Sequence, residues 1–136
     1  MIWMLDTDTV GYLINRGPGA DRIKRRLSGR SAGEVRLSAI TLVEIRYGFA
    51  AGDVSVERHD ALEDFLALFQ IDDFPASAAE DYAAIRVALE RAGRRIGGYD
   101  LLIAAHARHI NATLVTNNES EFKRAPGLSV QNWSKP

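Results

Sequence analysis

The stretch Met1-Ile-Trp-Met-Leu-Asp6-Thr7-Asp8 opens the chain as an apolar, strand-like run that leads directly into a carboxylate. Two later acids also interrupt apolar segments: Glu44 follows Ile40-Thr-Leu-Val, and Asp100 precedes Leu101-Leu-Ile-Ala-Ala. Desolvating a charge in such a setting is costly unless another group compensates it. Several carboxylates at one place also repel one another, and a divalent cation relieves that repulsion. The three acids therefore point to a metal-dependent enzyme.

The composition is that of a soluble globular protein with one domain, residues 1–136. This length allows a single substantial core, and the hydrophobic content of 46% is ordinary. Cysteine is absent, which excludes disulfides and Cys-based zinc or iron–sulfur sites. The apolar run before Asp6 is too short for a signal peptide or a membrane span, so we expect a cytoplasmic protein that does not bind membranes.

The net charge of −1 gives no global attraction to nucleic acid. Basic residues cluster locally at Lys24-Arg25-Arg26 with Arg30, and at Arg91 with Arg94-Arg95. Such runs are more often solvated helix faces than binding sites, so alone they carry little weight.

Helical and β-favouring segments alternate along the chain. We predict helices over residues 9–15, 20–27, 39–51, 56–69, 76–93 and 99–109. We predict strands over residues 2–5, 35–38, 71–74, 113–116 and 128–131. Thr7 or Asp8 is expected to cap the first helix. The alternation predicts an α/β fold with a mostly parallel sheet covered by helices on both faces, and ligands of such folds bind beyond the carboxyl ends of the strands.

Each acid also has a structural interpretation that involves no metal. Asp6 is a favoured N-cap residue, Glu44 fits an exposed position of an amphipathic helix, and Asp100 complements the partial positive charge at a helix N-terminus. The apolar run after Asp100 indicates a buried helix, which favours a ligand role there. His106 and His109 are three residues apart but lack an HExxH-like partner, so we assign them no zinc site.

Taken in order, these segments resemble the PIN-domain ribonucleases, specifically the VapC-type toxins of bacterial toxin–antitoxin systems. The resemblance covers essentially the whole chain and implies a three-layer α/β/α sandwich that holds Mg²⁺ or Mn²⁺ with acidic residues. The matching segments are Met4-Leu-Asp6-Thr7, Leu37-Ser-Ala-Ile-Thr-Leu-Val-Glu44-Ile-Arg-Tyr-Gly48, Gly98-Tyr-Asp100-Leu-Leu-Ile-Ala-Ala-His-Ala, Leu114-Val-Thr116-Asn-Asn118-Glu-Ser-Glu121-Phe122 and Pro126-Gly-Leu-Ser-Val-Gln-Asn-Trp133.

The resemblance assigns catalytic and metal-binding roles to three acids. Asp6, Glu44 and Asp100 match the core acids of the family. By this match Asp6 and Asp100 bind the metal, and Glu44 holds or deprotonates the attacking water. A water activated by the metal would then hydrolyse an RNA phosphodiester, in a transfer RNA or a ribosomal RNA.

The fourth acidic position departs from many relatives. They carry an aspartate two residues beyond the threonine, where this chain has Asn118, and Glu121 stands in as the acid. Both remain candidate metal ligands, Asn118 through its carbonyl oxygen. Thr116 matches a hydroxyl that lies beside the acids in the family. Thr7 and Asp8 are expected to line the same cleft, and Asp8 is equally suited to a helix start.

The family also implies partners. VapC-type proteins generally form homodimers and are silenced by a small antitoxin whose tail occupies the active-site groove. We therefore expect a bacterial, cytoplasmic protein that forms a homodimer or a toxin–antitoxin hetero-oligomer and meets operator DNA only through its cognate antitoxin. Leu62, Phe65, Leu66 and Phe69 follow helical spacing and belong either to an interface or to the core.

Two other classes of function remain open from the residues alone. The first class is a metal-dependent phosphatase or DNA nuclease on a similar sheet. A phosphatase of the haloacid dehalogenase type matches the short motif Asp6-Thr-Asp8-Thr9, but it needs a late lysine, and Lys123 stands in an unsuitable context. A non-catalytic PIN-like module or a receiver-type switch is the second class. A receiver needs acids and a lysine that are missing here, and an inactive scaffold is expected to have lost the three acids.

Overall fold

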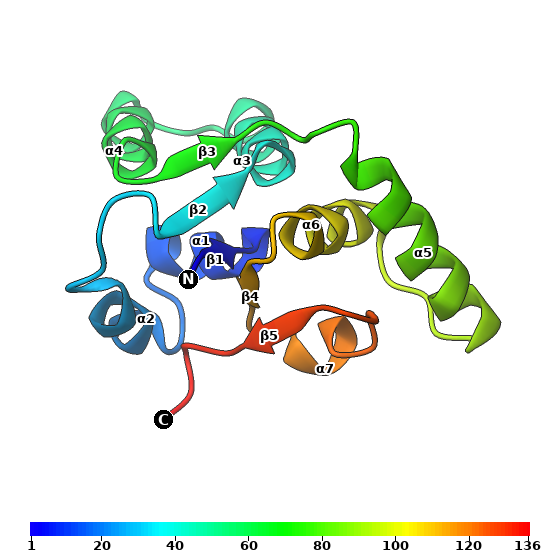
Figure 1. The fold of residues 1–136 in the computed structure, drawn as a ribbon. Coiled ribbons are helices and arrows are strands. Elements are labelled where there is room, and N and C mark those ends of the chain that lie inside the picture. The colour runs from blue at the N-terminus through cyan, green and yellow to red at the C-terminus, as the bar shows by residue number, and fades with distance from the viewer.

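A computed structural model describes residues 1–136 as five strands and seven helices that alternate along the chain (Figure 1). The strands are β1 (Trp3–Leu5), β2 (Val35–Ser38), β3 (Gln70–Asp72), β4 (Thr113–Val115) and β5 (Ser129–Gln131). The helices are α1 (Thr7–Asn15), α2 (Ala20–Leu27), α3 (Ala39–Ala51), α4 (Val56–Leu66), α5 (Ala78–Arg91), α6 (Gly98–His109) and α7 (Glu119–Phe122). None of the helices has both the length and the apolar character that crossing a bilayer requires.

The strands form one sheet in the order β3-β2-β1-β4-β5, and every pair is parallel. Side chains alternate between the two faces of a strand, so the sheet separates two apolar cores. Met4 and Leu114 enter the core built mainly with α5, α6 and α7, whereas Leu5 and Val115 enter the core built with α1 to α4. Figure 1 shows α5, α6 and α7 on one side of the sheet and α2 and α4 on the other. The predicted three-layer α/β/α sandwich is confirmed.

The predicted elements differ from the structure mainly at their ends. Helix α4 ends at Leu66, three residues earlier than the predicted end at Phe69, because Leu68 and Phe69 turn back to bond the carbonyls of Phe65 and Leu66. Strand β3 is accordingly shifted to Gln70–Asp72, where Ile71 pairs with Leu37 of β2. The region after β4, where no helix was predicted, contains helix α7.

The N-cap of α1 is Asp6, so the prediction of Thr7 or Asp8 was wrong. The Asp6 carboxylate accepts a hydrogen bond from the Thr9 amide at 2.8 Å. Thr7 and Asp8 already have helical backbone and form the first turn. Capping and site formation are therefore not alternatives at Asp6, because the same carboxylate does both.

The C-terminal segment folds back onto the start of the chain. The Trp133 ring lies 6.0 Å from that of Trp3, and the Arg30 guanidinium lies 4.0 Å from the Trp3 ring and 4.8 Å from the Trp133 ring. Gly19 makes room for this segment: its φ is +80°, and a Cβ atom there would lie 2.6 Å from the side chain of Ser134. An ordinary L-residue at position 19 would meet both a backbone penalty and a clash.

Candidate active site

Asp6 lies at the carboxyl end of β1 and is held by three neighbours. Its backbone N–H donates to the Val115 carbonyl at 3.0 Å, and its carboxylate accepts from the Thr9 amide and, at 2.5 Å, from the Thr116 hydroxyl. Only 2% of the residue is exposed. Burial raises the pKa of Asp6 to about 6, although the hydrogen bonds from Thr116 and Thr9 favour the charged form. The side chain is fixed in place but is costly to ionise.

Asp100 lies in the first turn of α6 and faces the same edge of the sheet. Its pKa is also raised to about 6, first by burial and then by repulsion from other carboxylates. Such repulsion requires the carboxylates to lie close together in space. The acids that repel Asp100 are Asp6, Glu121, Asp8 and Glu44. The structure therefore gathers the predicted acids from β1, α1, α3, α6 and α7 at one place.

Glu44 is held by a pair of threonines. The hydroxyl of Thr7 donates to Oε1 of Glu44 at 2.6 Å, and it lies 3.3 Å from the hydroxyl of the fully buried Thr41. Glu44 is half-buried, so the alternative of an exposed helix position does not describe it. Oε2 of Glu44 has no partner in the chain and is free to bind water.

Asn118 and Glu121 come together through helix α7. Asn118 is the N-cap of this helix, and its side-chain amide donates a hydrogen bond to the Glu121 carboxylate. The Asn118 backbone N–H donates to the Thr116 hydroxyl at 2.9 Å, and that hydroxyl in turn donates to Asp6. A continuous chain of hydrogen bonds thus connects Glu121 to Asp6.

Several polar residues near these segments point elsewhere. Glu119 is bound by Lys123 at 3.4 Å and by Lys135 at 2.7 Å, so the lysine that the phosphatase alternative needs is engaged at the surface. His106 is fully buried, bonds the Ser38 hydroxyl at 2.8 Å, and has a pKa that burial lowers. The ring of His109 bridges Ser77 and Asp81 between α6 and α5. Both imidazoles thus have structural contacts within the chain.

The donor set suits a hard divalent cation. All its charged groups are carboxylates, and hard cations such as Mg²⁺ and Mn²⁺ prefer oxygen ligands. The acids are close enough to repel Asp100, yet no three acidic or histidine side chains converge tightly enough to enclose an ion by themselves. Mg²⁺ usually binds proteins through one or two carboxylates and keeps several of its waters, so it does not need a closed shell of protein ligands.

Comparison with known proteins identifies the family and the fold of the chain. A family model described as the PIN domain matches residues 3–128. The chain belongs to the PIN-domain family. This PIN domain is 41% identical to the ribonuclease VapC2 of Rickettsia felis, over 99% of the chain and 100% of the relative. It is 34% identical to the tRNA(fMet)-specific endonuclease VapC of Shigella flexneri, over 97% of the chain and 98% of the relative.

A solved structure of VapBC2 from Rickettsia felis, bound to a DNA fragment from its promoter, resembles the PIN domain with a TM-score of 0.87 and 39% identity. The alignment covers 98% of this chain and 99% of that chain. The predicted membership of the VapC-type ribonuclease toxins is therefore confirmed, whereas the phosphatase and receiver alternatives find no support.

Two residues of the PIN domain that support the candidate site were not predicted from the sequence. Thr9 supplies the amide that binds Asp6, and Thr41 lies beside the hydroxyl that orients Glu44. The spacing of Thr41, three residues before Glu44 on one helix, is a signal that both face the same side. Thr9 carries no comparable signal, because its contact depends on which residue caps α1.

Proposed function

We propose that this VapC ribonuclease hydrolyses phosphodiester bonds of transfer RNA with a bound Mg²⁺ or Mn²⁺. The observation that carries the proposal is the cluster of five carboxylates at the carboxyl edge of a parallel sheet, where burial first, and then repulsion from the other four carboxylates, raises the pKa of Asp100 to about 6. Such repulsion is what a divalent cation compensates. Transfer RNA is favoured over ribosomal RNA because a full-length relative at 34% identity carries the name tRNA(fMet)-specific endonuclease.

Asp6 and Asp100 are the proposed metal ligands, directly or through water. Asp6 is the more rigid of the two, because hydrogen bonds from Thr9 and Thr116 leave its carboxylate little freedom. When bound, the cation neutralises charge on the phosphoryl oxygens and lowers the pKa of water at the site. Glu121 completes the acidic set, and Asn118 holds its carboxylate in position.

Glu44 is the proposed base. Its Oε1 is occupied by the Thr7 hydroxyl at 2.6 Å, which leaves Oε2 to accept a proton from the attacking water. Thr7 fixes the direction in which that oxygen points and is thus a positioning residue. Asp8 is exposed and contributes negative charge to the cleft, and we assign it no contact with the reacting atoms.

The first test is cleavage of RNA by the purified, antitoxin-free chain. Total bacterial RNA and isolated tRNA would be incubated with Mg²⁺ or Mn²⁺, beside reactions that contain EDTA or the Asp6→Asn variant. We expect discrete tRNA fragments that require the metal and disappear in the variant. Asp73→Asn is the matched control, since Asp73 is exposed and outside the acidic cluster. Absence of cleavage by folded protein would overturn the proposal. Fragments of ribosomal RNA without tRNA fragments would mean that the substrate is ribosomal RNA.

The antitoxin is proposed to bind in an apolar groove between α1, α2 and α4. This groove has a volume of about 360 Å³, and its lining includes Leu13, Leu27, Phe65, Leu68 and Phe69. Cationic side chains from α2, α4 and the C-cap of α1 also line it, which suits an amphipathic segment that carries acidic residues. They are Arg16, Lys24 and Arg58.

The sequence left open whether four apolar residues belong to an interface or to the core, and the structure shows that they differ in burial. They are Leu62, Phe65, Leu66 and Phe69. Leu62 and Leu66 of α4 are 2% and 5% exposed and belong to the core. Phe65 and Phe69 are half-buried, stack with ring centroids 5.0 Å apart, and line the groove. Leu62 and Leu66 are thus core residues, although Leu62 also borders the groove, and we propose the interface role for Phe65 and Phe69.

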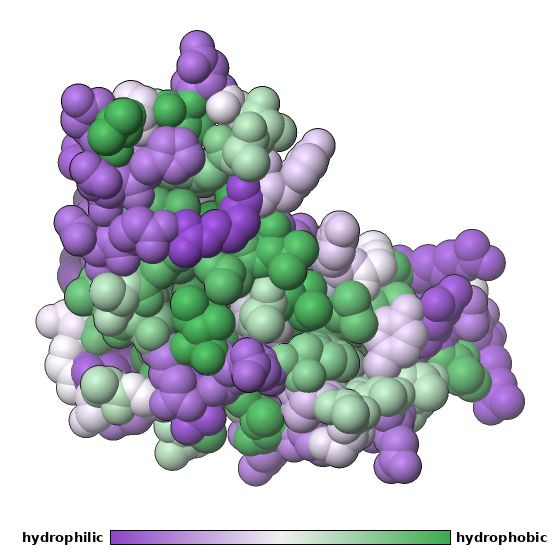
Figure 2. All heavy atoms as spheres, turned by 90° about the horizontal axis from the view of Figure 1, so that it is seen from above, coloured by the Kyte–Doolittle hydropathy of each residue, from purple (hydrophilic) through white to green (hydrophobic).

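A homodimer is proposed through the outer face of α3. Val43 and Tyr47 are 53% and 73% exposed and stand one helical turn apart, so they present an apolar strip to solvent. Figure 2, viewed from above, shows apolar side chains gathered among hydrophilic ones on this face. We further propose that residues 1–136 act as a single nuclease domain in the bacterial cytoplasm, where its RNA substrate and antitoxin are found, and reach operator DNA only through that antitoxin.

A further inference from the structure

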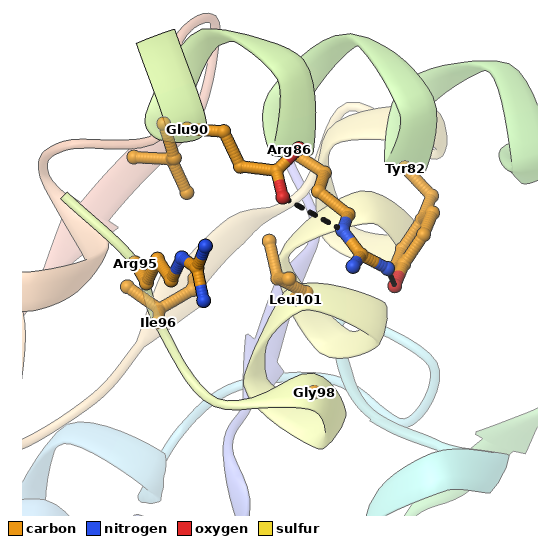
Figure 3. A pocket seen from close by; sticks show the side chains of 8 residues that line it. Tyr82, Arg86, Glu90, Arg95, Ile96, Gly98 and Leu101 are labelled. Atoms are coloured by element: carbon orange, nitrogen blue, oxygen red, sulfur yellow. Dashed lines mark hydrogen bonds and ion pairs between the residues drawn. The ribbon is translucent and has the colours of Figure 1, made fainter. Parts of the chain in front are cut away.

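A cavity lies between α5 and the segment that leads into α6 (Figure 3). Its volume is about 170 Å³, and its apolar lining is formed by Leu89, Ile96 and Leu101, which are 3%, 8% and 7% exposed. Tyr82 of α5 forms one wall. An apolar cavity of roughly 150 Å³ accepts a benzene ring. The cavity therefore has room for one planar ring of the size found in a nucleobase.

Two guanidinium groups line this cavity, and only one of them is paired with other side chains. Arg86 is already engaged, since it donates to the Tyr82 hydroxyl at 3.0 Å and lies 3.6 Å from Glu90. Arg95 takes part in no ion pair or side-chain hydrogen bond of the structure and is exposed. In Figure 3 Arg95 and Tyr82 lie on opposite sides of Leu101. An unpaired cation thus stands beside an apolar floor and an aromatic wall.

The cavity adjoins the acidic cluster through the start of α6. Gly98 and Leu101 line the cavity, and they flank Asp100 in the first turn of this helix. A Cβ atom on neighbouring Gly97 would lie 3.8 Å from the Asp100 carboxylate. A ligand that spans from the cavity to Asp100 therefore needs to cross only one turn of helix.

We propose that this cavity binds one nucleotide of the RNA substrate, adjacent to the phosphodiester that is cleaved. The base packs against Tyr82 and Leu101, and a flanking phosphate meets Arg95. The proposal rests on the proposed function, because it names a subsite of the same nuclease. Nucleic acid is the occupant that fits, since it joins a planar base to an anion and proteins bind single strands with just such pairs of aromatic and cationic groups.

The charge of the surroundings supports this occupant. Arg91, Arg94 and Arg95 follow closely in sequence. Glu90, the only acid that lines the cavity, is paired with Arg86. Arg46 of α3, by contrast, is bound by Glu63 on α4 and is less free to meet RNA. Arg95 is the cation that the cavity leaves available.

Binding of tRNA to a cleavage-dead chain tests the subsite without relying on catalysis. Asp6→Asn protein in EDTA would be titrated against end-labelled tRNA by fluorescence anisotropy at several salt concentrations. Adding Arg95→Ala is expected to weaken binding about tenfold and to reduce the salt slope by about one, as loss of one phosphate contact does. Arg25→Ala on α2 is the matched control, because α2 and α5 lie on opposite sides of the molecule in Figure 1. An equal loss of tRNA affinity in the Arg95→Ala and Arg25→Ala variants would overturn the proposal.

A second variant tests the place of the base. Gly98 lines the cavity and has open space around it, so Gly98→Leu is expected to fill the entrance without unfolding the chain. We expect it to weaken binding by at least about fivefold, the lower range for loss of one base stack. Circular dichroism would verify that each variant is folded. Unchanged tRNA binding by folded Gly98→Leu would exclude a base in the cavity.

The two proposals fail in distinguishable ways. If the wild-type chain cleaves tRNA and Arg95→Ala retains both its kcat/KM and its affinity, only the subsite is wrong. If the wild-type chain does not cleave RNA, the proposed function is wrong, and the anisotropy comparison still decides whether Arg95 and the cavity bind nucleic acid.

Discussion

The hydroxyl of Thr116 donates a hydrogen bond to the carboxylate of Asp6, a residue 110 positions earlier in the chain. The bond is possible because β1 and β4 are neighbours in parallel register, with Leu5 opposite Val115, so both strands end at the same level. The same hydroxyl accepts the N–H of Asn118 and so places the start of α7 beside Asp6. The register of two short strands thus sets the position of three candidate site residues.

Neutralising either central acid is expected to stabilise the metal-free chain while removing activity. Asp6→Asn and Asp100→Asn relieve burial cost and mutual repulsion, so the free energy of unfolding in EDTA should rise by about 1–3 kcal/mol. Cleavage should fall by at least about 100-fold. Thermal unfolding and RNA cleavage of the same preparations measure both effects, with Asp73→Asn as control. A variant that loses stability and keeps activity would contradict the assignment.

The stabilisation by Asp6→Asn is expected to depend on pH. The folded-state pKa of Asp6, about 6, exceeds the ordinary value of 3.8, so the folded state binds the proton more tightly. The wild-type chain therefore loses stability as the pH rises from about 4 to about 6, and the full deficit is present above that range. The difference between variant and wild type should be large at pH 7.5 and vanish near pH 3.5 in EDTA.

Only the difference between the two proteins tests this titration. Burial lowers the pKa of His106 in the folded state. A protein with such a histidine loses stability as the pH falls below the pKa that the imidazole has in the unfolded chain. That contribution has the opposite sign in an overlapping range but is common to both proteins, so it cancels. A stability difference that stays constant from pH 3.5 to 7.5 would show that Asp6 does not titrate as described.

Thr7→Val should reduce kcat with little change in RNA affinity. Thr7 orients Glu44 through a 2.6 Å hydrogen bond and is not proposed to touch the RNA. Loss of this orientation should cost roughly tenfold in kcat, a part of what a general base usually contributes. Thr7→Ser keeps the hydroxyl and should retain activity. If Thr7→Val instead raised KM and left kcat unchanged, Thr7 would be a substrate contact.

Leu68→Asp should release the enzyme from its antitoxin. Leu68 is 73% exposed at the antitoxin groove, so a charge there removes apolar contact without disturbing the core. We expect the affinity for the cognate antitoxin to fall by at least about tenfold, with ribonuclease activity intact. Titration of RNA cleavage with antitoxin measures both quantities. Inhibition at the wild-type antitoxin concentration would place the partner elsewhere. Asp64→Asn on α4 is the control.

Much of the fold was predictable because its periodicities are strong. The alternation of helix and strand was sufficient to predict the parallel sheet and its two covered faces. The ends of α4 and β3 were predicted less well, since Phe69 fits an apolar helix position although its backbone has already left the helix. Helix α7 is too short for a periodic signal.

The candidate site was likewise only partly predictable from the sequence. Asp6, Glu44 and Asp100 stood out because each carries charge within apolar sequence, and Glu121 was found through the family resemblance. The contacts that hold them, from Thr9, Thr41 and the amide of Asn118, depend on caps and tertiary neighbours that no local pattern encodes. Arg95 is a further case, because an unpaired guanidinium is defined by the partners that it lacks in space.

Gly19→Ala should destabilise the chain through its C-terminal segment. The new methyl group would clash with Ser134 in a backbone conformation with φ of +80°. A loss of about 1–3 kcal/mol is expected, together with weaker packing of Trp133 against Trp3. Tryptophan fluorescence during urea unfolding reports both. Gly29→Ala, also at positive φ but in open space, separates the backbone penalty from the clash. Equal losses in the two variants would mean that the Ser134 contact contributes nothing.

Because Asp6 and Asp100 repel each other, the stability of this toxin would depend on the same ion that its activity would require. A ligand that binds only the folded state shifts the folding equilibrium in proportion to its supply. If the bound ion is magnesium, as proposed, a cell with ample magnesium would hold a chain that is both active and more resistant to proteases. When magnesium became scarce, the repulsion would lower the stability of the folded chain, and more copies would unfold and be degraded. Ion supply would then set how many toxin molecules survive as well as how fast each one cuts.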